Sequence, residues 1–93
     1  MGKTIVPMHL IQNLFEFDLD LNHLGVFAML AKYEGEITFN DFLVIASKQG
    51  PEESRLSPFE INSIIKDGEK KSLLKIIKFK SHYKIEWLPK SFG

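Results

Sequence analysis

The sequence has 93 residues, a formal net charge of zero and no cysteine. The lack of cysteine excludes thiolate metal sites, cysteine nucleophiles and a disulfide framework, and the length corresponds to one domain with its own core. No apolar stretch approaches the ~20 residues of a membrane span, and the N-terminal residues lack the layout of a signal peptide, so we expect a cytoplasmic protein that contacts no membrane.

Charge is distributed unevenly along the chain. Residues 1–47 carry six acidic residues against two lysines, a net charge of −4, and residues 48–93 carry ten basic residues against six acidic ones, a net charge of +4. The second half therefore favours one anionic partner on one side of the domain, and an evenly solvated lysine surface is the alternative interpretation.

Residues 1–21 are predicted to form a short N-terminal arm and a short helix. The β-prone residues around Pro7 favour an edge strand or an extended lead-in beside a later hairpin, because proline cannot sit in a central strand. Residues 9–15 have apolar positions at helical spacing. Residues 16–21 alternate acidic and apolar side chains like a strand, although Asp20 is also a good cap for a following helix.

Residues 22–68 are predicted to hold the helical core. A first helix ends at Gly35, a residue typical of helix C-termini, and a second begins at Thr38, which has Asp41 three residues later as in a capping box. The apolar face of the first helix comprises Leu24, Phe27, Ala28, Leu30 and Ala31. That of the second comprises Phe39, Phe42, Leu43 and Ala46.

The third helix has the clearest start signal in the chain. Ser57 can cap the first free amides, Pro58 suits the first helical position, and Glu60 is placed to complete a capping box. An apolar stripe at positions i, i+3, i+4 and i+7 faces the core and is formed by Ile61, Ile64, Ile65 and Gly68. The opposite side of this helix is therefore left to face a partner.

Residues 72–88 are predicted to form a hairpin that breaks at residues 80–82. In its second half, apolar side chains alternate with Lys84 and Glu86, and these apolar positions are Tyr83, Ile85 and Trp87. In the first half, the core is expected to continue through Leu74, Ile76 and Ile77. Residues 36–37 are expected to pair with this hairpin as a short strand, and residues 89–93 to form a tail that nothing organises.

This order of elements predicts an α+β fold of the winged helix-turn-helix type, with three main helices, a C-terminal β-hairpin wing and a short N-terminal arm. We expect a single winged-helix domain over residues 1–93.

The sequence also resembles the N-terminal winged-helix domain of DnaD-like primosomal and phage replisome organiser replication-initiation proteins. The resemblance rests on TIVPMHLIQN near the start, on LNHLGVFAMLAKYEGEITFNDFLVIA with its Ile-Thr-x-x-x-Phe pattern, and on the helix-to-strand junction IIKDGEKKSLLKI. In that junction Ser72 stands where glycine is usual. The resemblance implies DNA binding and assembly without catalysis, in replication initiation of a phage, plasmid or bacterium, with transcription regulation as the next setting.

We therefore predict binding to double-stranded DNA. In the third helix, Asn62, Ser63 and Lys66 are placed for the major groove, where asparagine can pair with adenine. The remaining predicted contacts are to phosphates and come from Lys70, Lys71, Lys78, Lys80, His82 and Lys84. Carboxylates on the same helix, at Glu60, Asp67 and Glu69, oppose this interpretation.

The rival interpretation is a protein-protein interaction or oligomerisation module. Phe15, Phe17 and Leu19 could form an interface for self-association or for a replication protein, and their burial in the core is the alternative. An enzyme is not expected, because no serine has a histidine and an acid at a recognisable spacing. The three histidines are scattered singly, so we expect no metal site, no cofactor and no small-molecule substrate.

Overall fold

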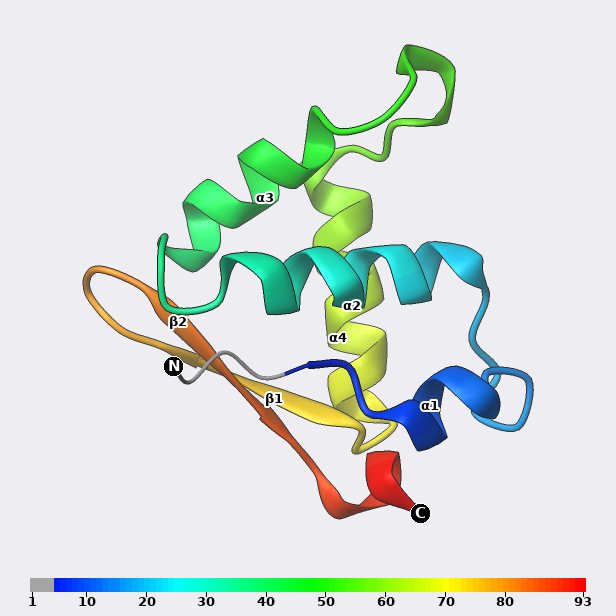
Figure 1. The fold of residues 1–93 in the computed structure, drawn as a ribbon. Coiled ribbons are helices and arrows are strands. Elements are labelled where there is room, and N and C mark those ends of the chain that lie inside the picture. The colour runs from blue at the N-terminus through cyan, green and yellow to red at the C-terminus, as the bar shows by residue number, and fades with distance from the viewer. Residues whose placement is uncertain (1–4) are drawn as a thin grey trace.

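The computed structural model describes residues 5–93 and shows an α+β arrangement in which four helices precede an antiparallel hairpin (Figure 1). The helices are α1 (Met8–Gln12), α2 (Leu21–Tyr33), α3 (Phe39–Ser47) and α4 (Pro58–Lys70), and the strands are β1 (Leu74–Lys78) and β2 (Tyr83–Trp87). Two short 3-10 turns, η1 (Glu52–Ser54) and η2 (Pro89–Phe92), follow α3 and β2. No helix within these residues has the length and apolar character needed to cross a membrane.

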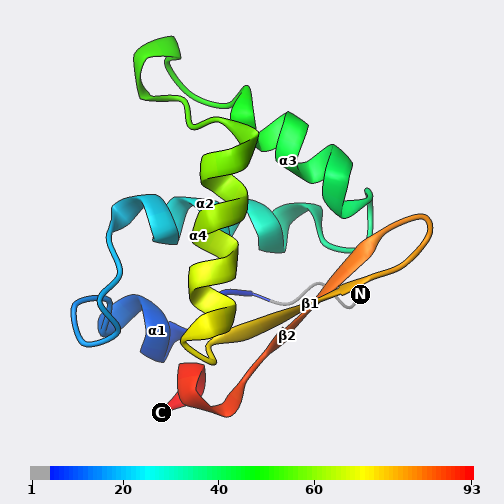
Figure 2. The ribbon, with the colours of Figure 1, turned by 180° about the vertical axis from the view of Figure 1, so that it is seen from behind.

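The helices pack around one core. Figures 1 and 2 show α4 crossing α2 on one side, with α3 packed near the N-terminal half of α4 and the hairpin leaving its C-terminal end. The predicted starts of α2 and α3 are confirmed, because Asp20 accepts a hydrogen bond from the His23 amide and Thr38 accepts one from the Asp41 amide. One detail of the α2 face was wrong, since Ala28 is exposed and Val26 is buried in its place.

The capping box of α4 is confirmed in both directions. The Glu60 amide donates to Ser57 Oγ at 3.1 Å, and the Ser57 amide donates to Glu60 Oε1 at 2.9 Å. The predicted apolar stripe is also confirmed, because Ile61, Ile65 and Gly68 are buried and Ile64 packs against the core. The side of α4 that carries this stripe is therefore buried against the rest of the protein.

The hairpin has the predicted strands and a register that pairs Leu74 with Trp87 and Lys78 with Tyr83. The alternation predicted for β2 is confirmed, because Tyr83, Ile85 and Trp87 are all buried. In β1 the expectation for Ile77 was wrong. It pairs with Lys84, whose side of the hairpin faces solvent, so Ile77 lies on that outer face.

Backbone bonds along the free edge of β2 join the hairpin to the turn after α2. The Tyr83 amide donates to the Ile37 carbonyl at 3.1 Å, and the Gly35 amide donates to the Tyr83 carbonyl at 2.9 Å. Residues 36–37 do not form a strand, so that part of the prediction was wrong. The segment does lie beside the hairpin, as predicted, and the two bonds join it to β2.

The segment before α2 is a series of turns, so of the two alternatives left open for residues 16–21 the strand is wrong and the cap at Asp20 is confirmed. Asp18 has a φ of 58°, which turns the chain sharply, and Asp20 caps α2 instead of extending a strand. Of the arm, residues 1–4 lie outside the described residues, and residues 5–7 form no strand. Pro7 directly precedes α1, and the short helix predicted over residues 9–15 is confirmed only in its first part, because residues 13–15 are turns.

The C-terminal tail is organised, contrary to expectation. Pro89–Phe92 forms the 3-10 turn η2 and contacts α1. The Ser91 side chain is fully buried, and its hydroxyl donates to the Leu73 and Leu88 carbonyls. The same two carbonyls also accept backbone amides, Leu73 from Leu88 and Leu88 from Ser91, so the serine adds a further donor and its own buried hydroxyl is satisfied.

Gly68 of α4 packs tightly against Leu74 of β1 and Phe27 of α2. A methyl group at this position would lie 2.6 Å from Leu74 Cδ2 and 2.9 Å from Phe27 Cζ, and both neighbours are buried. We expect Gly68→Ala to destabilise the fold by about 1 kcal/mol, because overpacking of about 1–3 kcal/mol exceeds the helix-propensity gain of about 1 kcal/mol. Urea unfolding followed by Trp87 fluorescence measures the change.

Gly25→Ala in α2 is the matched control, since nothing lies within 4 Å of its added methyl group and the helix-propensity gain should remain. A Gly68→Ala variant as stable as the Gly25→Ala variant would contradict this packing.

Ser72 is the residue that ends α4 with a left-handed conformation. Its φ is 62°, its amide donates to the Glu69 carbonyl, and the Leu73 amide donates to the Gly68 carbonyl. This pair of bonds is the Schellman arrangement, in which glycine is favoured because it has no Cβ to crowd the carbonyl. We expect Ser72→Gly to raise the free energy of unfolding by about 0.5–1 kcal/mol, measured by the same urea unfolding. A loss of stability would show that the serine side chain has a favourable role there.

Candidate nucleic-acid interface

The α4 outer face consists of Phe59, Ser63, Lys66 and Lys70. These residues recur at i, i+4, i+7 and i+11, which places them opposite the buried stripe, and all four are exposed. Asn62, predicted as a base reader, lies at the flank of this face and is half-buried. Ser63 and Lys66 are therefore better placed than Asn62 to meet a partner in front of the helix.

The carboxylates of α4 have internal hydrogen-bond partners. Glu60 completes the capping box, and Glu69 Oε2 accepts from the Ile76 amide of β1 at 3.1 Å. Asp67 Oδ2 lies 2.9 Å from Lys71 Nζ and 3.0 Å from His23 Nε2. All three carboxylates are thus directed to the flanks of the helix, and the outer face keeps only lysine charges.

The hairpin lysines are divided between its two faces. Lys78 pairs with the buried Tyr83, and its Nζ lies 4.6 Å from the centroid of the Phe39 ring at the start of α3. Lys84 pairs with Ile77 on the opposite, exposed face. The register therefore separates Lys78 from the other predicted phosphate contacts.

The hairpin outer face consists of three cross-strand pairs: Lys75 with Glu86, Ile77 with Lys84, and Phe79 with His82. Lys75 did not stand out in the sequence as a site residue, and its exposure places it beside the predicted contacts. The alternation of β2, carried across the turn at residues 80–81, would have identified it.

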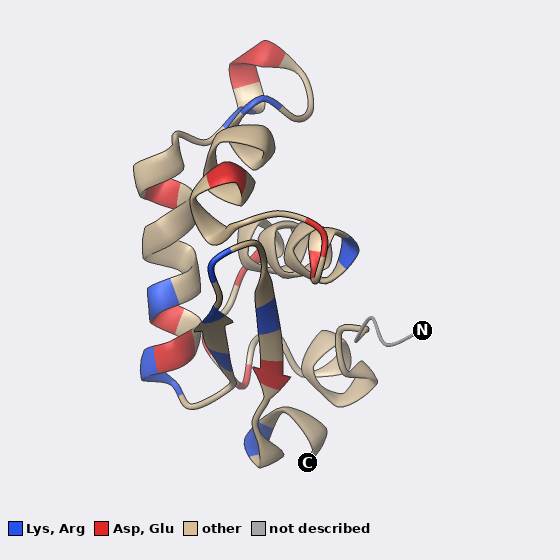
Figure 3. Cartoon of the chain, turned by 90° about the vertical axis from the view of Figure 1, so that its left-hand side faces the viewer, with Lys and Arg blue, Asp and Glu red and all other residues tan. Residues whose placement is uncertain are grey.

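The lysines of α4 and the hairpin differ in whether their ammonium groups have partners within the protein. Lys71 also donates to the Asp18 carbonyl at 2.9 Å, so its ammonium is held inside the molecule by two partners. A second group of lysines has no acidic partner within residues 5–93. It comprises Lys66, Lys70, Lys75, Lys80 and Lys84. Figure 3 shows the blue segments of α4 and the hairpin on one side of the molecule, with red segments among them.

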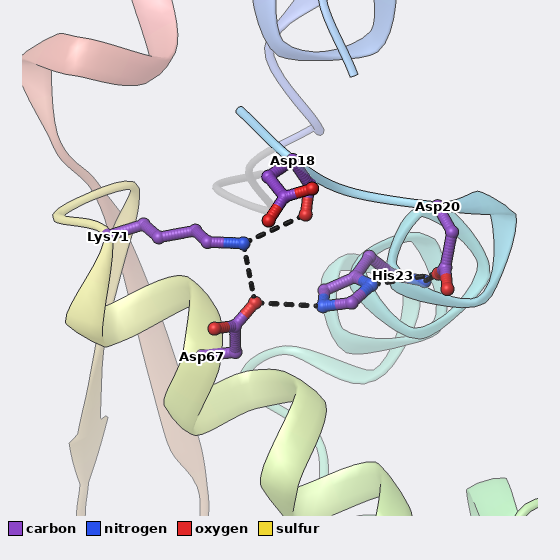
Figure 4. Close-up of polar contacts among 5 residues, drawn as sticks. All are labelled: Asp18, Asp20, His23, Asp67 and Lys71. Carbon is purple, nitrogen blue, oxygen red and sulfur yellow. Dashed lines mark hydrogen bonds and ion pairs between the residues drawn. The ribbon is translucent and has the colours of Figure 1, made fainter. Parts of the chain in front are cut away.

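A polar network ties α2 to α4 beside this surface (Figure 4). His23 lies between two carboxylates, with Nδ1 2.8 Å from Asp20 Oδ1 and Nε2 3.0 Å from Asp67 Oδ2. The hydrogen bond from Lys71 lowers the pKa of Asp67, and the hydrogen bond from His23 lowers the pKa of Asp20. The network fixes the side of α4 that carries Asp67 and Lys71.

The predicted protein interface is not assembled as a surface. Leu19 is only 4% exposed and belongs to the core, and Phe17 is partly buried with its ring edge-on to His9. Phe15 is 95% exposed in the turns after α1. The turns at residues 13–18 break the alternation that would have aligned the three side chains.

No protein-family model, curated protein or solved structure matches this chain. The resemblance to DnaD-like and phage replisome organiser domains therefore stays a prediction from the residues quoted above.

The lowered carboxyl pKa values predict a pH-dependent contribution to stability. The folded-state pKa of Asp67 lies below its ordinary 3.8, so the stabilisation is present above that value and is lost as the pH falls through the folded pKa. At neutral pH we expect Asp67→Asn to lower the free energy of unfolding by about 0.5 kcal/mol, because the ion pair is partly exposed to solvent. The difference from wild type should shrink toward zero in acid, as measured by urea unfolding across a pH series.

Glu53→Gln serves as the control, because Glu53 is exposed in η1 and has no partner within residues 5–93. A difference between Asp67→Asn and wild type that does not change with pH would contradict the assignment.

Proposed function

We propose that this chain is a winged-helix domain that binds double-stranded DNA and performs no catalysis. The observation that carries the proposal is the division of charge on α4, where the carboxylates bond to groups of the protein itself and Lys66 and Lys70 are left free on an exposed face. A helix of this kind fits the major groove, and a hairpin beside it can follow the phosphate backbone.

Within this proposal, Ser63 meets base edges, with Asn62 reaching them from the flank, and Lys66 and Lys70 bind phosphates near the groove. The wing contacts to phosphates come from the exposed lysines Lys75, Lys80 and Lys84, with His82 at the tip. For Lys71 and Lys78 the predicted phosphate contacts compete with contacts inside the protein, since Lys71 pairs with Asp67 and Lys78 lies over the Phe39 ring.

The proposed setting is replication initiation in a phage, plasmid or bacterium, followed by transcription regulation. It rests on the sequence resemblance, which includes the helix ending at Gly35 and the junction at Ser72. Both residues have positive φ values, so the two places where the family pattern has glycine are places where the backbone favours it.

The alternative function is a protein-protein interaction or oligomerisation module. It is favoured by one observation, the exposure of two large apolar side chains, Phe15 and Leu21, which are 95% and 77% exposed. Leu21 also borders a groove of about 330 Å³ between α2, α3 and the loop that precedes α4. Such a surface would respond to protein concentration, whereas contacts with phosphates respond to salt.

Lys66→Gln together with Lys70→Gln should weaken binding to a mixed-sequence duplex by about tenfold or more at low salt. The two lost phosphate contacts should also reduce the slope of log affinity against log salt by about 2. Fluorescence anisotropy at two salt concentrations measures both quantities.

Lys48→Gln with Lys90→Gln is the matched control, because it removes the same charge from exposed positions outside the proposed interface. Equal losses in the two double variants would show that binding reflects overall charge. If the wild-type domain fails to bind duplex at low salt while its mass rises with concentration, the alternative function replaces this one.

A further inference from the structure

The tip of the hairpin carries an exposed aromatic pair that the fold does not use. The Phe79 and His82 rings lie face to face, with centroids 4.8 Å apart and an interplanar angle of 19°. The Phe79 amide donates to the His82 carbonyl at 2.8 Å, so the two residues flank the turn at residues 80–81. Phe79 is 50% exposed and is absent from the hydrophobic core cluster, so its ring is available at the end of the wing.

The backbone and the His82 ring together hold this aromatic ring in place. Ser81 Oγ lies 3.0 Å from His82 Nδ1, which adds a polar contact to the stacked pair. A rigid ring backed by a second ring loses little conformational freedom when another flat group stacks on its exposed face. The pair is therefore preorganised for a planar ligand.

The charges around the tip favour an anionic ligand. Lys80 lies in the turn itself, and Lys84 lies on the hairpin outer face one cross-strand pair from Phe79. The carboxylate of that face, Glu86, lies opposite Lys75 in the strand register, near the other end of the strands. A planar group attached to a phosphate chain matches this combination of a ring and two unpaired cations.

We propose that Phe79 stacks on an unpaired nucleobase where a DNA duplex ends or opens. This inference rests on the proposed DNA binding and adds the structural feature of the DNA that the domain prefers. Inside a duplex, both faces of every base are covered by neighbouring bases and only the edges are open in the grooves. An aromatic ring can offer its face only to a base that has left the stack, and such stacking tolerates any base sequence.

The test compares one duplex in four forms: blunt, with a short 5′ overhang, with a short 3′ overhang, and with overhangs of abasic sugars. Wild type should bind one or both overhang forms about tenfold more tightly than the blunt form, in line with the strength of base–aromatic stacking. The abasic overhangs should bind like the blunt duplex, because they keep the phosphates and lack the base.

The variants separate stacking from simple apolar contact. Phe79→Leu keeps the apolar volume without the aromatic face, Phe79→Ala removes both, and Phe79→Trp keeps the face. The leucine and alanine variants should lose the overhang preference and keep blunt-duplex affinity within about twofold, and the tryptophan variant should retain the preference. Because Phe79 lies outside the core, circular dichroism should show all three variants folded.

The outcomes of this test distinguish the stacking of Phe79 from the proposed DNA binding on which it rests. Equal binding of blunt and overhang forms by wild type, or a preference that survives Phe79→Leu, overturns the stacking and leaves duplex binding in place. Phe79-dependent binding to the overhang forms without any binding to the blunt duplex supports the stacking and overturns the proposed function. Failure to bind any of these DNAs at low salt overturns both.

Discussion

The position of the hairpin depends on carboxylates that bind its two edges. Ile76 and Ile85 face each other across the ribbon, and their amides point outward, where Glu69 Oε2 of α4 accepts from Ile76 and Glu34 Oε2 accepts from Ile85 at 2.7 Å. A two-stranded hairpin is marginal by itself in water, and a hydrogen bond to a charged group contributes about 1.5–3 kcal/mol. Glu34 is buried, so its bond is shielded from competing water, and the Tyr83 hydroxyl, whose pKa is raised by burial, stays protonated and donates to the Leu30 carbonyl.

These edge contacts also determine the surface charge. The edge of β1 is covered by Glu69, which both blocks pairing with another strand and takes a carboxylate away from the α4 outer face. Asp67 is drawn to the opposite flank by Lys71 and His23. On α4, therefore, the lysines lie on the outer face and the carboxylates lie on the flanks. There, Glu69 bonds to β1 and Asp67 bonds to α2.

Local signals in the sequence predicted the elements well where the chemistry is confined to a few neighbouring residues. The capping box at Ser57, the stripe of Ile61 and Ile65, and the alternation of Tyr83 and Ile85 depend only on helix or strand periodicity. At residues 16–21 the sequence left a strand and a cap at Asp20 open, and the cap is what forms, because six alternating residues are too few to outweigh the turn at Asp18. The prediction was wrong at Ser91 because the partner of that hydroxyl, the Leu73 carbonyl, is supplied by a distant part of the chain.

The candidate site was harder to predict than the fold because the side on which each lysine lies depends on a register that composition does not reveal. Lys78 and Lys80 are two residues apart, yet Lys78 is committed to the inner face against Phe39 and Lys80 lies in the turn. If β1 were shifted by one residue relative to β2, Lys78 would lie on the outer face of the hairpin and Ile77 on the inner face. A shift of one residue exchanges the two faces of a strand. The buried Tyr83 fixes the position of β2: its ring packs against Phe39 and Phe42, and its backbone bonds to Gly35 and Ile37, so the core selects which lysines and which aromatic ring the hairpin presents.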